Sequence, residues 1–328
     1  MNKGNRFTLV TTAKNEGPYF LEWIAYHRLI GFSSFVIFQN DSEDYTHDIL
    51  SCLSALGIVN YKYNRADTGK HQIQAYRRAV RQPEYQNSDW VMALDMDEFL
   101  CLLPPLETLD DWFGKLPEAD QIYVNWAMFG NSGLTDITPD LVSEKFRLAA
   151  PREASAKDFR PFKTLFRRDR FQRPGIHMPV PMEAGPAEIR TVNASGLTGQ
   201  QFEQRNFQSK DPGRLALAQI NHYVVRDAAS FVIKSWKGSA HQANRSVDQT
   251  FWQKRNRNQA MDETLSRRAG RIRDEMQALD ALSGGRLMQL RKKSIDWHRH
   301  KFHEIIKDDY YRDLFSFCCL NNGRRAII

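Results

Sequence analysis

Short apolar runs alternate with helix-like patterns through the first hundred residues of the chain. The runs that predict strands occupy residues 7–12, 35–38, 58–63 and 90–94. Patterns with helical periodicity follow Pro18 and Thr46 and span residues 71–81. Because helices and strands alternate at short spacing, we expect an α/β fold with a doubly wound, mostly parallel sheet.

The second part of the chain has weaker periodicity. Further strands are expected at residues 121–126 and 220–224, and a short helix at 108–113. Residues 150–215 are rich in Arg, Pro, Gln and Gly and predict irregular loops with short strands. Residues 253–282 and 287–307, in a stretch rich in Arg, Lys, Gln and Asn, predict amphipathic helices that are mostly exposed. We therefore divide the chain into an α/β domain at 1–240 and a basic, mainly helical C-terminal extension at 241–328.

Polar clusters follow three of the predicted strands. They are Lys14 to Glu16, Asn40 to Ser42 and Asp95 to Glu98. Sheets of this kind bind ligands in the crevice beyond the carboxyl ends of their strands. In a strand, Asp95 and Asp97 would point to the same face, about 6.6 Å apart, and two carboxylates can hold Mg²⁺ or Mn²⁺ over a phosphate group. An acidic turn or helix start is the alternative interpretation.

Composition adds weaker constraints on partners and compartment. The net charge of +7 and the pI near 9.2 fit an anionic partner such as a nucleotide, a phospholipid surface or nucleic acid. No apolar run has the length of a membrane span, and the first residues do not read as a secretory signal. The four cysteines lack CxxC spacing, so we expect a reducing, cytoplasmic compartment.

Five segments occur in an order that matches a known family. They are KNEGPYFLEWIAYHRLIGF from Lys14, QNDSED from Gln39, LDMDEFL from Leu94, VNWAMFGNSG from Val124 and NHY from Asn221. Over roughly residues 7–240 the chain resembles the glycosyltransferase family 2-like proteins of the subgroup close to family 92. The usual acidic pair that serves as the base in family 2 is not obvious here, and the segment after about residue 240 lies outside the resemblance.

The resemblance implies a GT-A fold with the catalytic domain at 1–240. It implies a nucleotide-sugar donor, usually UDP-linked, a divalent cation (Mn²⁺ or Mg²⁺) and inverting, hexosyltransferase-like transfer. The acceptor would be a glycan or a lipid-linked glycan, as in polysaccharide biosynthesis. The basic extension leaves open a peripheral contact with the inner face of the membrane.

The resemblance also assigns roles to individual residues. Asp95 and Asp97 match the DxD motif, with Asp97 as the direct metal ligand and Asp95 on ribose or metal. The loops with Lys14, Asn15, Glu16 and Asp41 would hold the nucleoside, or would simply cap their strands. Gly130 and Gly133 would let the chain pass close to the donor sugar. His222 would complete the metal site, or is a core histidine.

The acceptor base and several basic groups have two interpretations each. The favoured base is Glu144, with Asp136 as its rival, although Glu144 can equally be a surface residue paired with Lys145 or Arg147. Three basic side chains also have two interpretations: Lys163, Arg167 and Arg168. They would stabilise the leaving diphosphate, or they line a solvated strand edge. The histidines expected as a surface cluster on a basic helix are His298, His300 and His303.

Two other functions compete with sugar transfer. The basic residues after 240 would suit nucleic-acid binding, but the chain carries no nucleic-acid signature motif. A nucleotidyltransferase would carry a Gly-rich loop with Lys or Arg after the first strand, whereas KNEGPYF has one glycine.

Overall fold

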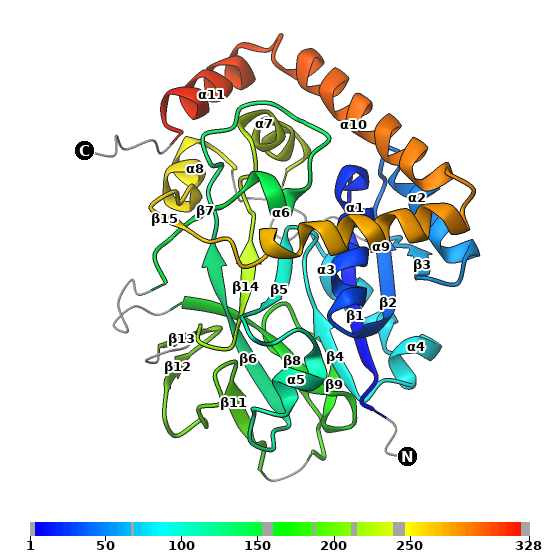
Figure 1. Cartoon of the computed structure of the whole chain (residues 1–328), viewed down its shortest axis with the longest axis vertical. Helices are drawn as coiled ribbons and strands as arrows, with labels where there is room; N and C mark the ends of the chain where they lie inside the picture. Colours follow the sequence, from blue (N-terminus) through cyan, green and yellow to red (C-terminus); the bar gives the residue numbers. More distant parts are fainter. Residues whose placement is uncertain are drawn as a thin grey trace.

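The structure is a computed structural model that describes residues 4–66, 69–152, 160–185, 188–210, 215–238 and 247–322. Its centre is a mixed sheet whose main path runs β3-β2-β1-β4-β8-β6-β14-β5 (Figure 1). The bounds of these strands are β1 Phe7–Ala13, β2 Phe32–Gln39, β3 Asn60–Tyr63, β4 Trp90–Ala93, β5 Glu98–Leu102, β6 Gln121–Met128, β8 Arg160–Arg167 and β14 Ala218–His222. The strands β3, β2, β1 and β4 are parallel, as are β6 and β14, while β8 and β5 run antiparallel to their neighbours.

Helices alternate with strands in the first part of the chain and make up most of it after residue 228. They are α1 Gly17–Leu29, α2 Thr46–Ala55, α3 His71–Ala79, α4 Pro83–Gln86, α5 Leu109–Phe113, α6 Val142–Lys145, α7 Ala228–Lys237, α8 Gln249–Arg255, α9 Ala269–Leu282, α10 Arg286–Ile305 and α11 Asp309–Leu320, with 3₁₀ turns at Arg168–Arg170 and Ser266–Arg268. The shorter strands are β7 Leu148–Ala149, β9 Phe171–Arg173, β10 Val180–Pro181, β11 Thr191–Asn193, β12 Glu203–Arg205, β13 Gln208–Lys210 and β15 Ala260–Met261.

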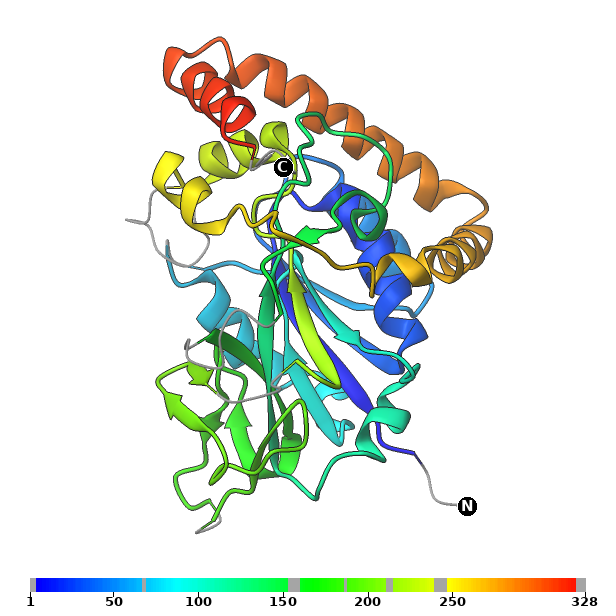
Figure 2. The same cartoon turned by 60° about the vertical axis from the view of Figure 1, so that its left-hand side comes forward.

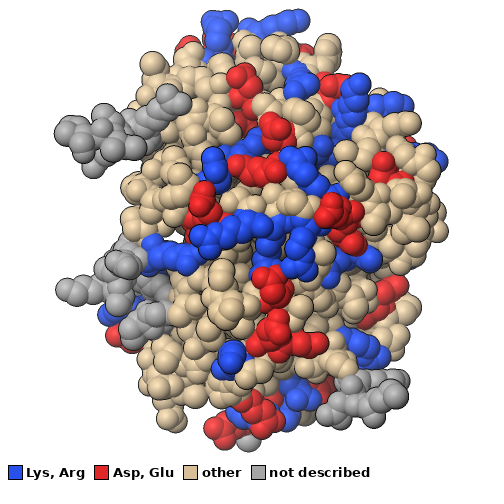
Figure 3. Space-filling model, in the orientation of Figure 1, with Lys and Arg blue, Asp and Glu red and all other residues tan. Residues whose placement is uncertain are grey.

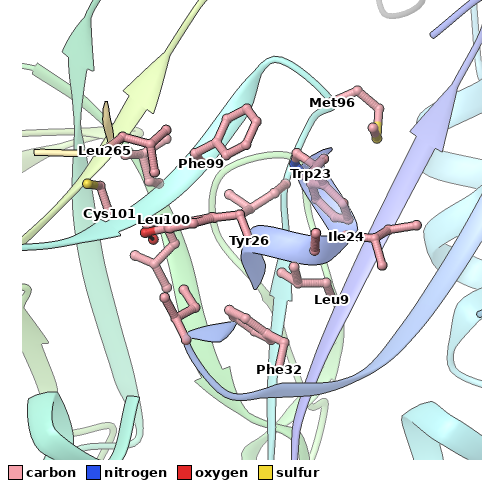
Figure 4. Close-up of a cluster of buried hydrophobic side chains, with 14 of the residues drawn as sticks. Leu9, Trp23, Ile24, Tyr26, Phe32, Met96, Phe99, Leu100, Cys101 and Leu265 are labelled. Carbon is pink, nitrogen blue, oxygen red and sulfur yellow. Dashed lines mark hydrogen bonds between the residues drawn. The ribbon is translucent and has the colours of Figure 1, made fainter. Parts of the chain in front are cut away.

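Helix α1 is buried on every side, between the sheet and helices α9 and α10. Its Trp23 and Tyr26 pack in the cluster that Figure 4 shows, against Phe99 of β5 and Leu265 from the C-terminal part of the chain. Trp23 Nε1 donates to the carbonyl of Glu98 at 2.8 Å, and Tyr26 Oη to that of Leu100 at 2.8 Å. Each large apolar side chain buried in this way contributes about 1.5–3 kcal/mol. Helix α1 is therefore the central helix of the core.

The helices after residue 240 belong to the same core. Ile272 and Met276 of α9 and Leu287 of α10 lie in one apolar cluster with the sheet, and α11 joins α7, α8 and α10 in a second. Figures 1 and 2 show α10 and α11 lying across the end of the molecule at which the parallel strands end. The predicted division at residue 240 thus does not coincide with a division of the core. The helices are amphipathic, as predicted, but each buries one face. Over the part of the chain that the structure describes, no helix is both long and apolar enough to span a membrane.

Two segments differ from the sequence prediction for identifiable reasons. Strand β8 lies in the middle of the sheet, although only loops and short strands were expected in this part of the chain. The strand was not recognised because the charged but buried Lys163 interrupts its apolar pattern. The single helix predicted at 253–282 is divided into α8 and α9. Between them Asn256 accepts a hydrogen bond from the backbone of Asn131 at 2.8 Å, and β15 pairs with β7. These tertiary contacts override the helical periodicity.

Candidate active site

The loops after β1 and β2 lie side by side at the carboxyl-end edge of the sheet. Asn15 and Asp41 have positive φ angles of 52° and 44°. The Asn15 side-chain oxygen accepts from the Glu43 backbone at 2.7 Å, and the Asn15 backbone donates to Ser42 Oγ at 3.0 Å. The predicted nucleoside loops are thus bonded to each other. A broad groove beside them is lined by Gln39, Asp41, Ser42, Tyr45, His47 and Tyr63.

Asp95 and Asp97 lie in a tight turn between β4 and β5, so their predicted placement along one extended strand is wrong. The backbone of Glu98 donates to the Asp95 carbonyl at 3.0 Å, and the Glu98 carboxylate accepts from the Asp95 backbone at 2.9 Å. Both hydrogen bonds join residues 95 and 98, so they hold the chain in a reversal of direction over three residues. The acids therefore reach partners on different elements.

The partner of Asp95 is Lys163 of β8, whose Nζ lies 2.9 Å from Oδ2. Lys163 also lies 3.3 Å from the Glu98 carboxylate, and both side chains are buried. Burial raises the pKa of Glu98 to about 8, against the opposing charge of Lys163. Burial disfavours the charged form of Lys163, but Asp95 and Glu98 together raise its pKa. Lys163 is therefore a permanent counter-charge inside the site.

The partners of Asp97 are Lys234 of α7 and His222 at the end of β14. Lys234 Nζ lies 2.8 Å from Asp97 Oδ2, and His222 Nε2 lies 3.6 Å from Oδ1. Burial opposes ionisation of Asp97, but the charge of Lys234 holds its pKa well below the usual value. Burial lowers the pKa of His222, against the attraction of Asp97, so that its ring is neutral near pH 7 and keeps a lone pair. The structure brings His222 and Asp97 together, as predicted.

Glu16 is the centre of a second group of charges. Its carboxylate pairs with Arg226, at 2.8 Å, and with Lys237 of α7. Lys237 also donates to the Lys14 carbonyl at 2.9 Å, and the Arg226 guanidinium lies 3.5 Å from the centre of the Tyr19 ring. Burial opposes ionisation of Glu16, but the two cations lower its pKa.

Of the basic side chains at this edge, sequence reasoning named Lys163 but missed Arg226, Lys234 and Lys237. Asp227 caps α7 by accepting from the Ser230 backbone at 2.8 Å, which fixes the helix that carries Lys234 and Lys237 one turn apart. The i, i+3 spacing of these lysines after the NHY segment was the available signal. A small cavity between the two charge groups is lined by Asn15, Glu16, Tyr19, Arg226, Lys234 and Lys237.

The two candidate bases have local partners. Glu144 of α6 forms an ion pair with Arg273 of α9, in place of the Lys145 or Arg147 considered from the sequence. Asp136 accepts from its neighbour Thr135 at 2.9 Å. Neither contact links these carboxylates to Asp95 or Asp97, so the role of each stays a prediction.

The predicted glycine loop at Gly130 and Gly133, and the arginines Arg167 and Arg168, contact other parts of the protein and not the acids of the site. A Cβ on Gly130 would lie 2.5 Å from the carbonyl of Arg257, so the close approach there is to the protein's own backbone and not to a donor sugar. Gly133 has φ of 76° and donates to the Asn131 side chain at 3.2 Å. In the antiparallel pairing of β8 with β4, Arg167 lies opposite Trp90, the first residue of β4, and Arg168 follows it in the chain. These arginines therefore lie away from the acids, and of the three predicted basic groups only Lys163 reaches them.

His298 is not on the surface, contrary to its predicted place in an exposed histidine cluster. Its Nε2 lies 2.7 Å from Asp44 Oδ2, and both side chains are buried. Asp44 also accepts from the Gly17 backbone at 2.9 Å and from Thr46 Oγ1 at 2.6 Å. Helix α10 is thereby attached to the loops of the candidate site.

Within the described ranges, no group of three or more His, Cys, Asp or Glu side chains is arranged to hold a metal ion. A cation would have two candidate ligands at Asp97 and His222. A carboxylate and a neutral imidazole suit Mn²⁺. Mg²⁺ and its analogues commonly take one or two protein ligands and complete their shell with phosphate and water. The donor set therefore fits a cation that is held jointly with a phosphate ligand.

Comparisons with known proteins agree with the resemblance. Residues 13–262 match the model of glycosyltransferase family 92. A family 92 protein of Oryza sativa subsp. japonica is 28% identical over 154 residues, covering 45% of this chain and 26% of its own length. One from Ricinus communis is 26% identical over 141 residues, covering 41% and 25%. The chain spans about a quarter of the length of these curated relatives.

Solved structures give partial matches. Residues 1–349 of TarS from S. aureus match with a TM-score of 0.31 and 17% identity, over 50% of this chain and 47% of that one. Glucosyl-3-phosphoglycerate synthase from Mycobacterium tuberculosis, in complex with phosphoglyceric acid, matches with a TM-score of 0.30 and 14% identity, over 62% and 73%. The family match extends over most of the chain, from Ala13 at the end of β1, and includes every later strand of the sheet. The chain, with its mixed α/β sheet, belongs to glycosyltransferase family 92.

Proposed function

We propose that this chain transfers a sugar from a nucleotide-sugar donor, expected to be UDP-linked, to a hydroxyl group of a glycan or lipid-linked acceptor. The observation that carries the proposal is the charge arrangement at the carboxyl-end edge of the sheet. There Asp95 and Asp97 lie within hydrogen-bond distance of Lys163 and Lys234. Such an edge is where sheets of this class bind nucleotides.

Basic side chains suit the diphosphate of the donor. Arg226 and Lys234 line the small cavity beside the nucleoside loops, whereas Lys237, also in its lining, is held by Glu16 and the Lys14 carbonyl. The cavity has a volume of about 20 Å³, room for roughly one water molecule, so a diphosphate would have to lie over it. There Arg226 and Lys234 would give it charge-assisted hydrogen bonds, which are about twice as strong as neutral ones. The same cations would stabilise the negative charge that develops on the leaving nucleotide. The open groove next to Asp41 would receive the nucleoside.

A divalent cation, Mn²⁺ or Mg²⁺, is part of the proposal. When bound, it would add positive charge against the leaving diphosphate. Asp97 and His222 would hold it, because one supplies an ionised oxygen and the other a neutral ring nitrogen. Asp95 is held by Lys163, so we expect it to position the donor ribose and not to bind the cation.

Transfer with inversion would require a carboxylate that takes the proton of the acceptor hydroxyl. We propose Glu144 or Asp136 for this step. Glu144 would have to leave Arg273 to act as a base, whereas Asp136 accepts a hydrogen bond from the neutral hydroxyl of Thr135.

The decisive experiment is donor turnover on the full chain. UDP- and GDP-sugars are offered in turn with Mn²⁺, and release of the nucleoside diphosphate is measured with an excess of a glycan acceptor mixture. We expect release from at least one UDP-sugar. No release from any donor, with a folded protein, would refute the transferase proposal.

Charge pairing argues against nucleic-acid binding by the C-terminal segment. On α9 and just before it, Arg268 and Arg271 pair with Glu107, and Arg273 pairs with Glu144. The face in Figure 3 accordingly shows Lys and Arg mixed with Asp and Glu. Paired arginines offer little net charge to a phosphate backbone. The pairing of these arginines therefore argues against nucleic-acid binding through α9.

A further inference from the structure

Lys234 connects helix α7 to the acid that is expected to hold the cation. Its ammonium group lies 2.8 Å from Asp97 Oδ2 and 2.8 Å from the carbonyl oxygen of Val224. The other Asp97 oxygen faces His222 Nε2 at 3.6 Å. The backbone of Asp97 is fixed as well, since its carbonyl accepts from the Tyr223 amide at 2.8 Å. In this arrangement Asp97 already has a full positive counter-charge.

The two lysines that face the acids differ in how firmly they are held. The Lys163 side chain is 1% exposed and contacts two carboxylates, so its removal would leave both without a counter-charge. The Lys234 side chain is 28% exposed and contacts one carboxylate. Because a lysine ammonium sits on a flexible four-carbon stem, Lys234 can move toward solvent while its helix stays in place. Lys234 is therefore the exchangeable partner.

We infer that Lys234 and the divalent cation are alternative partners of Asp97, and that the donor diphosphate draws Lys234 away. This inference rests on the proposed function. A cation that reaches Asp97 and His222 meets repulsion from the ammonium on the same carboxylate, since like charges a few ångströms apart oppose each other. A diphosphate carries about two negative charges and is the stronger partner for a lysine. The cation then takes the carboxylate that Lys234 leaves.

The consequence is that cation and donor bind together and either binds poorly alone. Without donor, Lys234 suppresses cation binding. With donor, the same ammonium changes from a competitor of the cation into a ligand of the diphosphate. Lys237 does not take part in this exchange, because its ammonium stays on Glu16 and the Lys14 carbonyl.

The test is calorimetric titration of Mn²⁺ into the full chain, with and without UDP. Lys234→Met removes the ammonium and keeps the length of the side chain, Lys237→Met is the matched control on the same helix, and Lys234→Arg retains a positive charge. Without UDP we expect Lys234→Met to bind Mn²⁺ about 10- to 100-fold more tightly than wild type, the factor that one charged hydrogen bond is worth. The other two variants should stay as weak as wild type.

The UDP titrations complete the test. In wild type, UDP should strengthen Mn²⁺ binding strongly, and Lys234→Met should lose most of this gain. Equal or weaker Mn²⁺ binding by Lys234→Met without UDP, or no detectable binding by any variant, would overturn the inference. Thermal melting of each variant checks folding, and Lys234→Gln replaces Lys234→Met if the latter melts early. Donor turnover in wild type is independent of these titrations, so the proposed function can survive their failure.

Discussion

Asp44 and His298 connect the loop after β2 to helix α10 over 254 residues of chain. The Asp44 side chain is fully buried, and the imidazole supplies one of its donors at 2.7 Å, beside Gly17, Thr46 and Ser294. His298→Ala removes that donor. A hydrogen bond to a charged group is worth about 1.5–3 kcal/mol, and the cavity left by the ring adds to the loss. We therefore expect His298→Ala to lower the free energy of unfolding by about 3 kcal/mol.

The matching thermal shift follows from the size of the chain. Unfolding entropy near 2.1 cal/mol/K per residue gives roughly 0.7 kcal/mol/K for 328 residues, so 3 kcal/mol lowers the midpoint by about 4 °C. Urea unfolding should show a lower midpoint with an unchanged slope. UDP binding should weaken too, because Asp44 holds the loop that contacts Asn15.

The control is His300→Ala, two positions along the same helix and exposed. A surface change of this kind should alter stability by no more than about 0.5 kcal/mol. If His298→Ala loses no more stability than His300→Ala, the buried contact does not stabilise the fold. The Asp44 pKa is lowered in the fold: burial opposes this, but His298 and Thr46 outweigh it. The stabilisation of the fold by ionised Asp44 should therefore be fully present above the pKa of an unfolded aspartate, near 3.9. It should be lost as the pH falls below that value towards the lower pKa of the folded state.

Three further predictions concern the site, and a fourth concerns the helices after residue 240. Asp97→Asn should abolish the gain in UDP affinity that Mn²⁺ gives wild type, measured by calorimetry, and a retained gain would make the acid structural. His222→Ala should weaken Mn²⁺ binding in the presence of UDP, while unaltered affinity would identify a core histidine. Of Glu144→Gln and Asp136→Asn, the variant that removes the base should lower turnover by about 10²–10⁴-fold with UDP affinity unchanged; normal turnover in both would place the base elsewhere. The full chain should float with liposomes of anionic lipid if the helices after residue 240 contact the membrane, and equal recovery with neutral lipid would refute that contact.

The alternating strands and helices of the first hundred residues could be predicted because their periodicity is local. Strand β1 was expected at 7–12 and lies at Phe7–Ala13, and α5 begins after Thr108, whose side chain caps it. Strand β8 could not be recognised in this way, because Lys163 is charged yet buried. Its partners Asp95 and Glu98 lie more than sixty residues earlier, and no local pattern reports such a pairing.

The candidate site shows the same limit. Asp95 and Asp97, the loops at Asn15 and Asp41, and His222 could be placed at one edge from motif order and strand ends. The lysines of α7 could not, because an amphipathic helix shows lysines on its exposed face for solubility as readily as for function. Gly130 was assigned to a ligand, whereas it fits against Arg257. A glycine indicates close approach but does not say to what.

The burial of α1 beneath α9 and α10 has a consequence for how the chain is made. Arg291 of α10 donates to the Pro18 carbonyl at 3.0 Å, across 273 residues. During synthesis at about 5–20 residues per second, the first helix would wait roughly 14–55 seconds before its cover leaves the ribosome. Throughout that interval Trp23, Tyr26 and their apolar neighbours have no C-terminal partner. Nascent chains of this protein should therefore depend on chaperones that hold exposed apolar helices, and chains that stall before α9 should aggregate or be degraded.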